Sequence, residues 1–257
     1  AVSAANPWAI AIFDIDGVIR DVGQSYRRAI ADTVEHFTAG AWRPTLADID
    51  TLKAEGIWNN DWKASEELIR RQGVEPPAYE VVVDFFQRRY RGQELDDPTR
   101  WDGYITVEPL LVGPDYFASL SAAGVGWGFF SGATPGSARF VLEQRLGLAD
   151  PVLVAMGDAP DKPDPTGFFQ AIAALEPPVE LLPAVYAGDT VADIHTALRA
   201  REAQPERPVL AVGVLPPHVL DEADRRDAYA QRLQDAGADL VVEALRDLTA
   251  ERLRQLL

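Results

Sequence analysis

The sequence of 257 residues contains no cysteine, one methionine and three histidines. Without cysteine, the chain has no disulfide, no thiolate zinc site and no cysteine nucleophile. Any catalytic or metal-binding chemistry must therefore depend mainly on carboxylates. Basic residues are also scarce, because 24 Lys and Arg stand against 40 Asp and Glu, which gives a net charge of −16. Nucleic acids and anionic membrane surfaces require a basic footprint on their partner, so neither is expected to bind.

Long hydrophobic runs are absent as well. The longest apolar stretches, such as residues 8–13 and 125–130, are far shorter than the roughly 20 residues of a membrane-spanning helix. The first residues lack the basic segment of a secretory signal peptide, so we expect a soluble, cytoplasmic protein. The composition is otherwise typical of a globular protein, with 47% hydrophobic and 25% charged residues. This length predicts one large domain or two unequal ones.

Short apolar runs alternate with helical patterns over most of the chain. Such runs, when bounded by turn residues, are typical of buried strands in a parallel sheet. They lie at residues 8–13, 125–130, 152–156, 184–187, 209–212 and, more weakly, 240–242. Strand followed by helix, repeated, predicts an α/β fold with a Rossmann-like, doubly wound parallel sheet. Residues 22–107 show helical patterns and no buried strand, which predicts an all-helical insertion into a core made of residues 1–21 and 108–257.

Acidic residues follow two of the predicted strands. Asp14 and Asp16 come directly after the first strand, and residues two apart in an extended chain point to the same face. Asp189 follows the fourth strand, and Asp193 lies four residues later on the first turn of a helix. Open α/β sheets bind ligands at the carboxyl ends of their strands, and closely spaced carboxylates need a cation or a proton between them. We therefore expect a site for Mg2+, which prefers oxygen ligands.

Two further polar signals lie between these acidic pairs. Ser131 and Gly132 follow the second predicted strand, and Lys162 precedes a rigid proline. In phosphoryl transfer, a carboxylate can act as the nucleophile and form an aspartyl-phosphate, and a second carboxyl group can carry protons to and from the reacting oxygens. A cation, an ammonium group and a hydroxyl stabilise the phosphoryl oxygens. The residues together thus predict a phosphoryl-transfer site.

In their order along the chain, these motifs resemble those of the haloacid dehalogenase-like (HAD) hydrolase superfamily. Residues 14–18 are similar to its first motif, Ser131 to its second, Lys162 and the following proline to its third, and residues 188–193 to its fourth. The insertion at residues 22–107 resembles the helical C1-type cap of subfamily I. One departure is Gly132, where the family often has asparagine. The backbone N–H remains at that position, so we expect activity to survive.

The resemblance implies a role for each motif residue. Asp14 would be the nucleophile and a metal ligand, and Asp16 the general acid and base, with its backbone carbonyl on the metal. Asp189 would complete the metal site. Asp193 would act through water or hold Lys162. Lys162 would take part in catalysis and bind phosphate together with Ser131 and Gly132. The acid at position 16 favours phosphate esters over carbon–halogen bonds as substrates.

The expected activity is Mg2+-dependent hydrolysis of a small phosphorylated metabolite of the sugar, polyol or glycolate type, by a monomer or homodimer. A phosphomutase of the β-phosphoglucomutase type would share every core residue, and the sequence does not distinguish the two. A non-catalytic binding protein on the same fold is the third alternative. Such proteins usually lose the nucleophile or a metal-binding acid, and this chain retains both.

The most unusual stretch of the insertion is residues 58–63, Trp-Asn-Asn-Asp-Trp-Lys. In one interpretation, Asn60 or Asp61 caps a helix that runs to about residue 71, and the tryptophans pack. In the other, the segment contacts a polyol or sugar-like part of the substrate. The residues that would do so are Asn59, Asn60, Trp62 and Lys63. Both interpretations stay open, as does the place of His195, either at the surface or beside the site.

Overall fold

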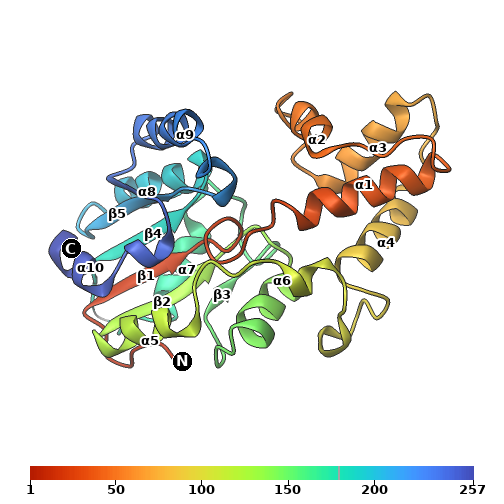
Figure 1. Cartoon of the computed structure of the whole chain (residues 1–257). Coiled ribbons are helices and arrows are strands. Elements are labelled where there is room, and N and C mark those ends of the chain that lie inside the picture. The colour runs from red at the N-terminus through yellow and green to blue at the C-terminus, as the bar shows by residue number, and fades with distance from the viewer. Residues whose placement is uncertain (179) are drawn as a thin grey trace. The chain divides into compact units, whose positions relative to one another are not determined.

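The computed structural model describes residues 1–178 and 180–257. The chain forms two compact units (Figure 1). The first consists of Ala1–Asp21 together with Pro109–Leu257, and the second is Val22–Glu108. The second unit is therefore inserted between two segments of the first.

The first unit is built on a six-stranded parallel sheet. The strands are β1 (Ala9–Phe13), β2 (Val125–Phe130), β3 (Leu153–Val154), β4 (Ala184–Gly188), β5 (Val209–Val214) and β6 (Leu240–Val242). Their order across the sheet is β3-β2-β1-β4-β5-β6, so every predicted strand and the doubly wound topology are confirmed. The chain proceeds from β1 toward one edge of the sheet and from β4 toward the other. The crevice at the carboxyl ends of these two strands is where folds of this kind bind ligands.

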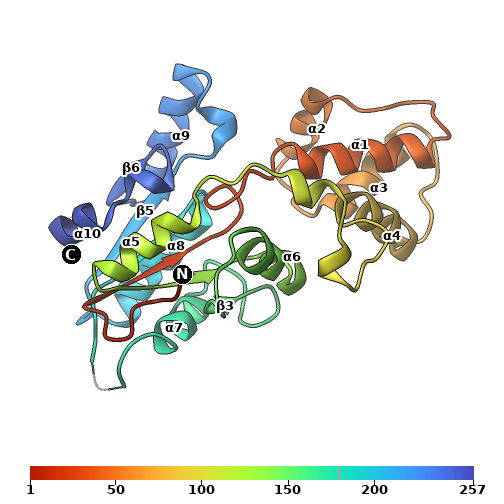
Figure 2. The same ribbon diagram turned by 60° about the horizontal axis from the view of Figure 1, so that its bottom comes forward.

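Helices cover both faces of this sheet (Figures 1 and 2). They are α5 (Pro114–Ala122), α6 (Pro135–Arg139), α7 (Thr166–Ala173), α8 (Val191–Ala203), α9 (Ala223–Asp235) and α10 (Ala250–Leu256). The sequence predicts a helix over residues 136–146, and the structure has two forms of helix there, because α6 continues as a π-helix over Phe140–Arg145. There the Leu146 amide donates to the carbonyl of Val141, five residues earlier. Short 3-10 turns lie at Pro217–Val219 and Leu245–Asp247.

Alternate residues of each strand pack against opposite layers, as the period of two in a β-strand requires. Ile10 and Ile12 belong to the cluster that buries the apolar faces of α7, α8 and α9. Phe13 points to the other face, where its ring meets that of Phe117 on α5 edge-on with centroids 6.0 Å apart. With both faces covered, β1, β2 and β4 are buried along their whole length, which explains their continuous apolar sequences.

The second unit contains helices only. These are α1 (Ser25–Phe37), α2 (Leu46–Lys53), α3 (Asp61–Arg71) and α4 (Tyr79–Tyr90), followed by 3-10 turns at Pro98–Arg100 and Tyr104–Val107. Helix α1 packs against α3 and α4. Tyr26 of α1 stacks on Tyr90 of α4 with ring centroids 4.7 Å apart, and Trp62 of α3 meets Phe86 edge-on. In the described parts of both units, no helix is long and apolar enough to cross a membrane.

Candidate active site

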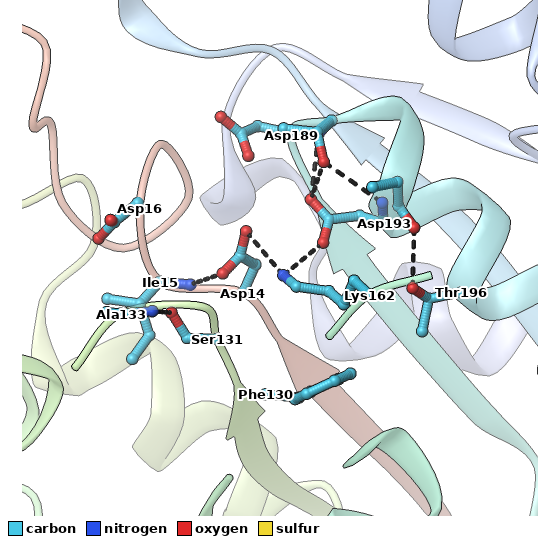
Figure 3. A network of polar contacts seen from close by, with 12 residues as sticks. Asp14, Ile15, Asp16, Phe130, Ser131, Ala133, Lys162, Asp189, Asp193 and Thr196 are labelled. Atoms are coloured by element: carbon cyan, nitrogen blue, oxygen red, sulfur yellow. Dashed lines mark hydrogen bonds and ion pairs between the residues drawn. The ribbon is translucent and has the colours of Figure 1, made fainter. Parts of the chain in front are cut away.

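Charged side chains converge at the carboxyl edge of the sheet (Figure 3). Asp14 follows β1, Asp189 follows β4, and Asp193 lies on the first turn of α8. One carboxylate oxygen from each lies within 4.8 Å of the others. The ammonium group of Lys162, from the loop between β3 and α7, points among them. Residues from three parts of the sequence therefore meet at the point that the topology predicts.

The loop after β1 holds Asp14 close to the β4 loop. The Asp14 side chain is almost fully buried, and its Oδ1 accepts a hydrogen bond of 2.7 Å from the Ile15 amide. Gly17 has a φ of +79°, and a Cβ there would lie 2.2 Å from Oδ2 of Asp189. Only glycine combines this backbone conformation with such a close approach. Gly17 thus lets the two carboxylate-bearing loops come together.

Asp193 is fixed by the start of α8. Thr190 is the N-cap of this helix, and its hydroxyl accepts from the Asp193 amide while the Asp193 carboxylate accepts from the Thr190 amide. The other carboxylate oxygen accepts a hydrogen bond of 2.6 Å from Lys162 Nζ. A Cβ on Gly188 would lie 2.2 Å from Asp193 Cγ, so the end of β4 also depends on glycine. The Asp193 carboxylate therefore takes part in the capping box of α8 and also binds Lys162.

Lys162 lies between Asp14 and Asp193. Its Nζ is 3.3 Å from Asp14 Oδ2 and donates to Asp193 and to the Tyr186 hydroxyl, 2.9 Å away. Burial lowers the pKa of a lysine, but Asp14, Tyr186 and Asp193 outweigh it and hold the pKa of Lys162 well above its ordinary value. The side chain therefore carries a permanent positive charge beside the predicted nucleophile.

One ammonium group does not neutralise three carboxylates, of which Asp14 and Asp193 are buried and Asp189 is half-buried. Burial, opposed by Lys162 and assisted by Asp193, raises the pKa of Asp14 to about 7. Burial and the charge of Asp14 raise the pKa of Asp189 well above its ordinary value. Asp193 is also buried, but Lys162 and the Thr190 hydrogen bonds hold its pKa below the ordinary value. The three carboxylates thus share a single ammonium group, that of Lys162, and oxygen donors with such an excess of negative charge fit a hard divalent cation such as Mg2+.

The structure places the Asp16 carboxylate outside the group formed by Asp14, Asp189 and Asp193 (Figure 3). The chain turns after Phe13 instead of remaining extended, so the expectation that Asp14 and Asp16 point to the same face is wrong. Asp16 instead accepts a hydrogen bond of 2.7 Å from Nε of Arg20. The metal-binding role that the resemblance implied for Asp16 concerns its backbone carbonyl, and it stays a prediction.

The loop after β2 supplies the hydroxyl and amide groups expected for an anion. Ser131 is buried, and its Oγ accepts a hydrogen bond from the Ala133 amide, 3.1 Å away. Gly132 is exposed, and nothing lies within 4 Å of the position that a Cβ would occupy. The loop therefore leaves open space beside Gly132. The phosphate-binding roles of Ser131 and Gly132 stay predictions.

Sequence reasoning missed Tyr186, which lies within β4. Its hydroxyl lies 2.8 Å from the carbonyl oxygen of Phe130 and 3.1 Å from Asp193 Oδ1, and it accepts from Lys162. It therefore connects Lys162 and Asp193 to the end of β2. The available signal was a single hydroxyl-bearing residue within an otherwise aliphatic strand. Burial of such a group requires partners, which a sequence does not identify.

Substitution of Tyr186 by phenylalanine is expected to lower the free energy of unfolding by about 1–3 kcal/mol, because it removes a buried hydrogen-bonding group that contacts charged partners. Any hydrolytic activity should fall several-fold, since Lys162 loses one of its supports. Chemical denaturation and steady-state kinetics measure the two effects. Tyr116→Phe is the control, because its hydroxyl donates to the Leu248 carbonyl away from the crevice. Equal kinetic losses in both variants would contradict the prediction.

The unusual segment at residues 58–63 lies at the start of α3. Asn60 is the N-cap of this helix, and its Oδ1 accepts from the amides of Trp62 and Lys63 at 2.9 and 3.0 Å, which confirms the capping interpretation for Asn60. Asn59 and Lys63 are exposed, and the Lys63 ammonium lies 4.2 Å from the centroid of the Tyr79 ring. The substrate-binding interpretation stays a prediction. His195, in the first unit, is exposed on α8.

Comparisons with known proteins agree with this architecture. An imidazoleglycerol-phosphate dehydratase of Phytophthora nicotianae is 30% identical over 248 residues, which cover 93% of this chain and 51% of that protein. The chain therefore spans about half the length of this curated relative. A phosphonoacetaldehyde hydrolase-like protein of Oleispira antarctica has a similar structure, with a TM-score of 0.64, 19% identity and coverage of 99% and 97% of the two chains. The phosphatase Tt82 of Thermococcus thioreducens gives a TM-score of 0.62, 21% identity and coverage of 88% and 99%.

A family model supplies the assignment. The model of the haloacid dehalogenase-like hydrolases matches residues 8–201, which include all four motifs at the crevice. The resemblance deduced from the motifs and the expectation of a hydrolytic enzyme of this type are thereby confirmed. The chain belongs to the haloacid dehalogenase-like hydrolase family.

Proposed function

We propose that this protein is a Mg2+-dependent phosphomonoesterase that acts on a small phosphorylated metabolite through an aspartyl-phosphate. The observation that supports this proposal best is the position of Asp14. Its buried carboxylate lies 3.3 Å from the ammonium group of Lys162 and beside the carboxylate of Asp189. A nucleophile, a fixed cation and oxygen donors for a metal ion are what phosphoryl transfer requires.

In the first step, an Asp14 carboxylate oxygen forms a bond to phosphorus while the bond between phosphorus and the ester oxygen breaks. Asp16 gives its proton to the departing oxygen, which leaves as an alcohol. Lys162 and the loop at Ser131 and Gly132 stabilise the phosphoryl oxygens as charge redistributes. The product of this half-reaction is a phosphorylated Asp14.

In the second step, water replaces Asp14 on phosphorus. Asp16, now ionised, takes a proton from the water, whose oxygen bonds to phosphorus as the bond to Asp14 breaks. Inorganic phosphate is released and Asp14 returns to its carboxylate form. Lys162 keeps its positive charge through both steps, because its pKa is held well above the ordinary value by its acidic neighbours.

Asp14 and Asp189 would hold the Mg2+ ion, together with the backbone carbonyl of Asp16 that the family resemblance implies. When bound, Mg2+ supplies positive charge beside the transferring phosphoryl group. The fit is electrostatic, since the carboxylates of Asp14, Asp189 and Asp193 lie together with one ammonium group, and burial raises the pKa values of Asp14 and Asp189.

Addition of Mg2+ to protein treated with EDTA is therefore expected to raise the thermal midpoint. A cation that binds only the folded state stabilises it by about 2.7 kcal/mol at one hundred times its dissociation constant. Differential scanning calorimetry measures this shift without any substrate. Asp189→Asn should reduce it strongly, whereas Asp239→Asn should retain it, because Asp239 directly precedes β6 and pairs with Arg201 near the C-terminal end of α8. The absence of a Mg2+-dependent shift in the unaltered protein would refute the assigned metal site.

A phosphate-release screen with and without Mg2+ tests the proposed activity. The panel should contain sugar, polyol, glycolate and nucleotide monophosphates. It should also contain imidazoleglycerol phosphate, because the name of the Phytophthora nicotianae relative specifies that compound. Release of phosphate from one class of ester supports the proposal, and no release from any ester contradicts it. Conversion of a hexose 1-phosphate to the 6-phosphate without release of phosphate would instead identify a phosphomutase, for which the same core residues would serve.

We propose that the helical unit, residues 22–108, acts as the cap domain that selects the substrate. Asn59 is the most direct test, because its amide is exposed whereas that of Asn60 caps α3. Asn59→Ala is expected to raise the KM of the preferred ester about threefold or more, with little change in kcat, if the amide binds the substrate in ground and transition states alike. Gln72→Ala, at the far end of α3, is the control. Unchanged KM values would exclude Asn59 from substrate binding.

A further inference from the structure

Arg20 is a buried charged residue that has no role in the proposed mechanism. Its side chain is 0% exposed, although it lies only six residues after the predicted nucleophile. A guanidinium group is rarely buried to this extent unless acidic or polar partners surround it. Its partners therefore indicate what the buried charge is for.

The first partner is the predicted general acid and base. Nε of Arg20 donates to Asp16 Oδ1 at 2.7 Å, and the Asp16 side chain is 32% exposed. Arg20 and Asp16 are also linked through the backbone, because the Gly17 amide donates to the Arg20 carbonyl across the same turn. A short, partly exposed side chain on a turn can rotate into solvent. The buried guanidinium instead provides a fixed hydrogen-bond donor for it.

The second partner, Ser137, lies on the helix that follows the predicted phosphate-binding loop. The guanidinium Nη2 of Arg20 donates to Oγ of Ser137 at 2.9 Å, and Ser137 is buried on α6. This helix directly follows the loop that carries Ser131 and Gly132. Arg20 thus joins the turn after β1 to the element that follows the predicted phosphate-binding loop.

We propose that Arg20 is a positioning residue, which fixes the carboxylate of Asp16 and sets its place relative to the phosphate-binding loop through Ser137. The inference rests on the proposed phosphatase function, because Asp16 is assumed to transfer the proton. Arg20 itself does not touch the reacting atoms. Its effect should therefore be confined to the steps that need Asp16, whereas a purely structural role would affect all substrates alike.

Leaving groups of different basicity separate these roles. An alkyl phosphate needs protonation of its departing oxygen, whereas 2,4-dinitrophenyl phosphate releases a stable anion and does not. Because kcat/KM reports the first irreversible step, Arg20→Met should lower it about 10- to 100-fold for the alkyl ester and less than about threefold for the dinitrophenyl ester. In an Asp16→Ala background, Arg20→Met should cause less than about a twofold further loss with the alkyl ester.

Two other variants separate a positioning effect of Arg20 from a general loss of folding. Ser137→Ala removes one contact of the guanidinium and leaves Arg20 in place, so it should show the same selectivity at a smaller, several-fold size. Arg207→Met is the matched control, because Arg207 is 3% exposed in the same unit and pairs with Glu176 far from the crevice. Any loss in Arg207→Met should be equal for both esters. Equal losses for both esters in Arg20→Met and Ser137→Ala would overturn the proposal.

Crystal structures of the unaltered protein, Ser137→Ala and Arg20→Met give a readout that does not depend on activity. We expect one orientation of the Asp16 carboxylate in the unaltered protein and several orientations or a displaced carboxylate when Arg20 is replaced. The same single orientation in all three would overturn the proposal. Failure of the phosphatase assignment would appear differently, as an unaltered protein that hydrolyses neither ester.

Discussion

Replacement of Asp14 by asparagine is expected to reduce phosphate release at least about a thousandfold, because the variant has no carboxylate to form the covalent intermediate. Asparagine keeps the side-chain oxygen that accepts from the Ile15 amide, so the turn after β1 should remain intact. It also removes a buried carboxylate whose pKa is raised to about 7, mainly by burial. The thermal midpoint in EDTA should therefore stay the same or rise while activity is lost.

Two measurements make this result specific. The unaltered protein, quenched during turnover of a radiolabelled ester, should carry acid-stable label on Asp14, whereas Asp14→Asn should carry none. Asp161→Asn is the control for a changed charge, because Asp161 is exposed on the loop beside Lys162. Full activity in Asp14→Asn, or label attached to another residue, would disprove the assignment of the nucleophile.

Replacement of Lys162 by methionine should have the second-largest effect, on activity and stability together. Methionine has a similar length but no charge, so the phosphoryl oxygens lose a fixed cation, and kcat/KM should fall about 100- to 1,000-fold. Asp193, whose side chain is 0% exposed, would lose its ion pair at 2.6 Å. Removal of one partner from a buried ion pair typically costs about 3–5 kcal/mol, so the free energy of unfolding should fall by that order.

Lys53→Met is the matched control for this experiment. Lys53 forms a comparably short ion pair with Asp61, but both side chains are about one-quarter exposed and lie in the helical unit. Exposed pairs contribute about 0–1 kcal/mol, so this variant should unfold at nearly the same denaturant concentration as the unaltered protein. Comparable losses of stability in the two variants would show that Lys162 does not hold Asp193 as described.

The fold was accessible to sequence reasoning because a parallel sheet covered on both faces has continuous apolar strands. Residues 9–13, 125–130 and 184–188 are of this kind, and each was predicted to within a residue or two. Helix α2 was not predicted, and at residues 140–145 a helix was predicted but not its π form. The eight residues of α2 carry little apolar periodicity, and the π-helix has nearly the same apolar spacing as an α-helix.

The candidate site was predictable where a residue's place follows from the end of a strand. Asp14, Ser131 and Asp189 are of this kind, since the carboxyl ends of neighbouring parallel strands lie side by side. The orientation of Asp16 was not, because it depends on the turn at Gly17 and on a buried arginine four residues later. Tyr186 was missed for a related reason. Its partners come from segments distant in sequence, and only the folded chain brings them to its hydroxyl.

The insertion of the helical unit also has a consequence for folding. Ala9 of β1 pairs with Val125 of β2, so the central strand pair closes a loop of more than one hundred residues. Closure of a long flexible loop is entropically unfavourable and slows folding. Residues 22–108 within that loop form a compact unit from helices close together in sequence. We expect these helices to assemble first, so that the ends of β1 and β2 have a much shorter flexible chain to close when the sheet forms.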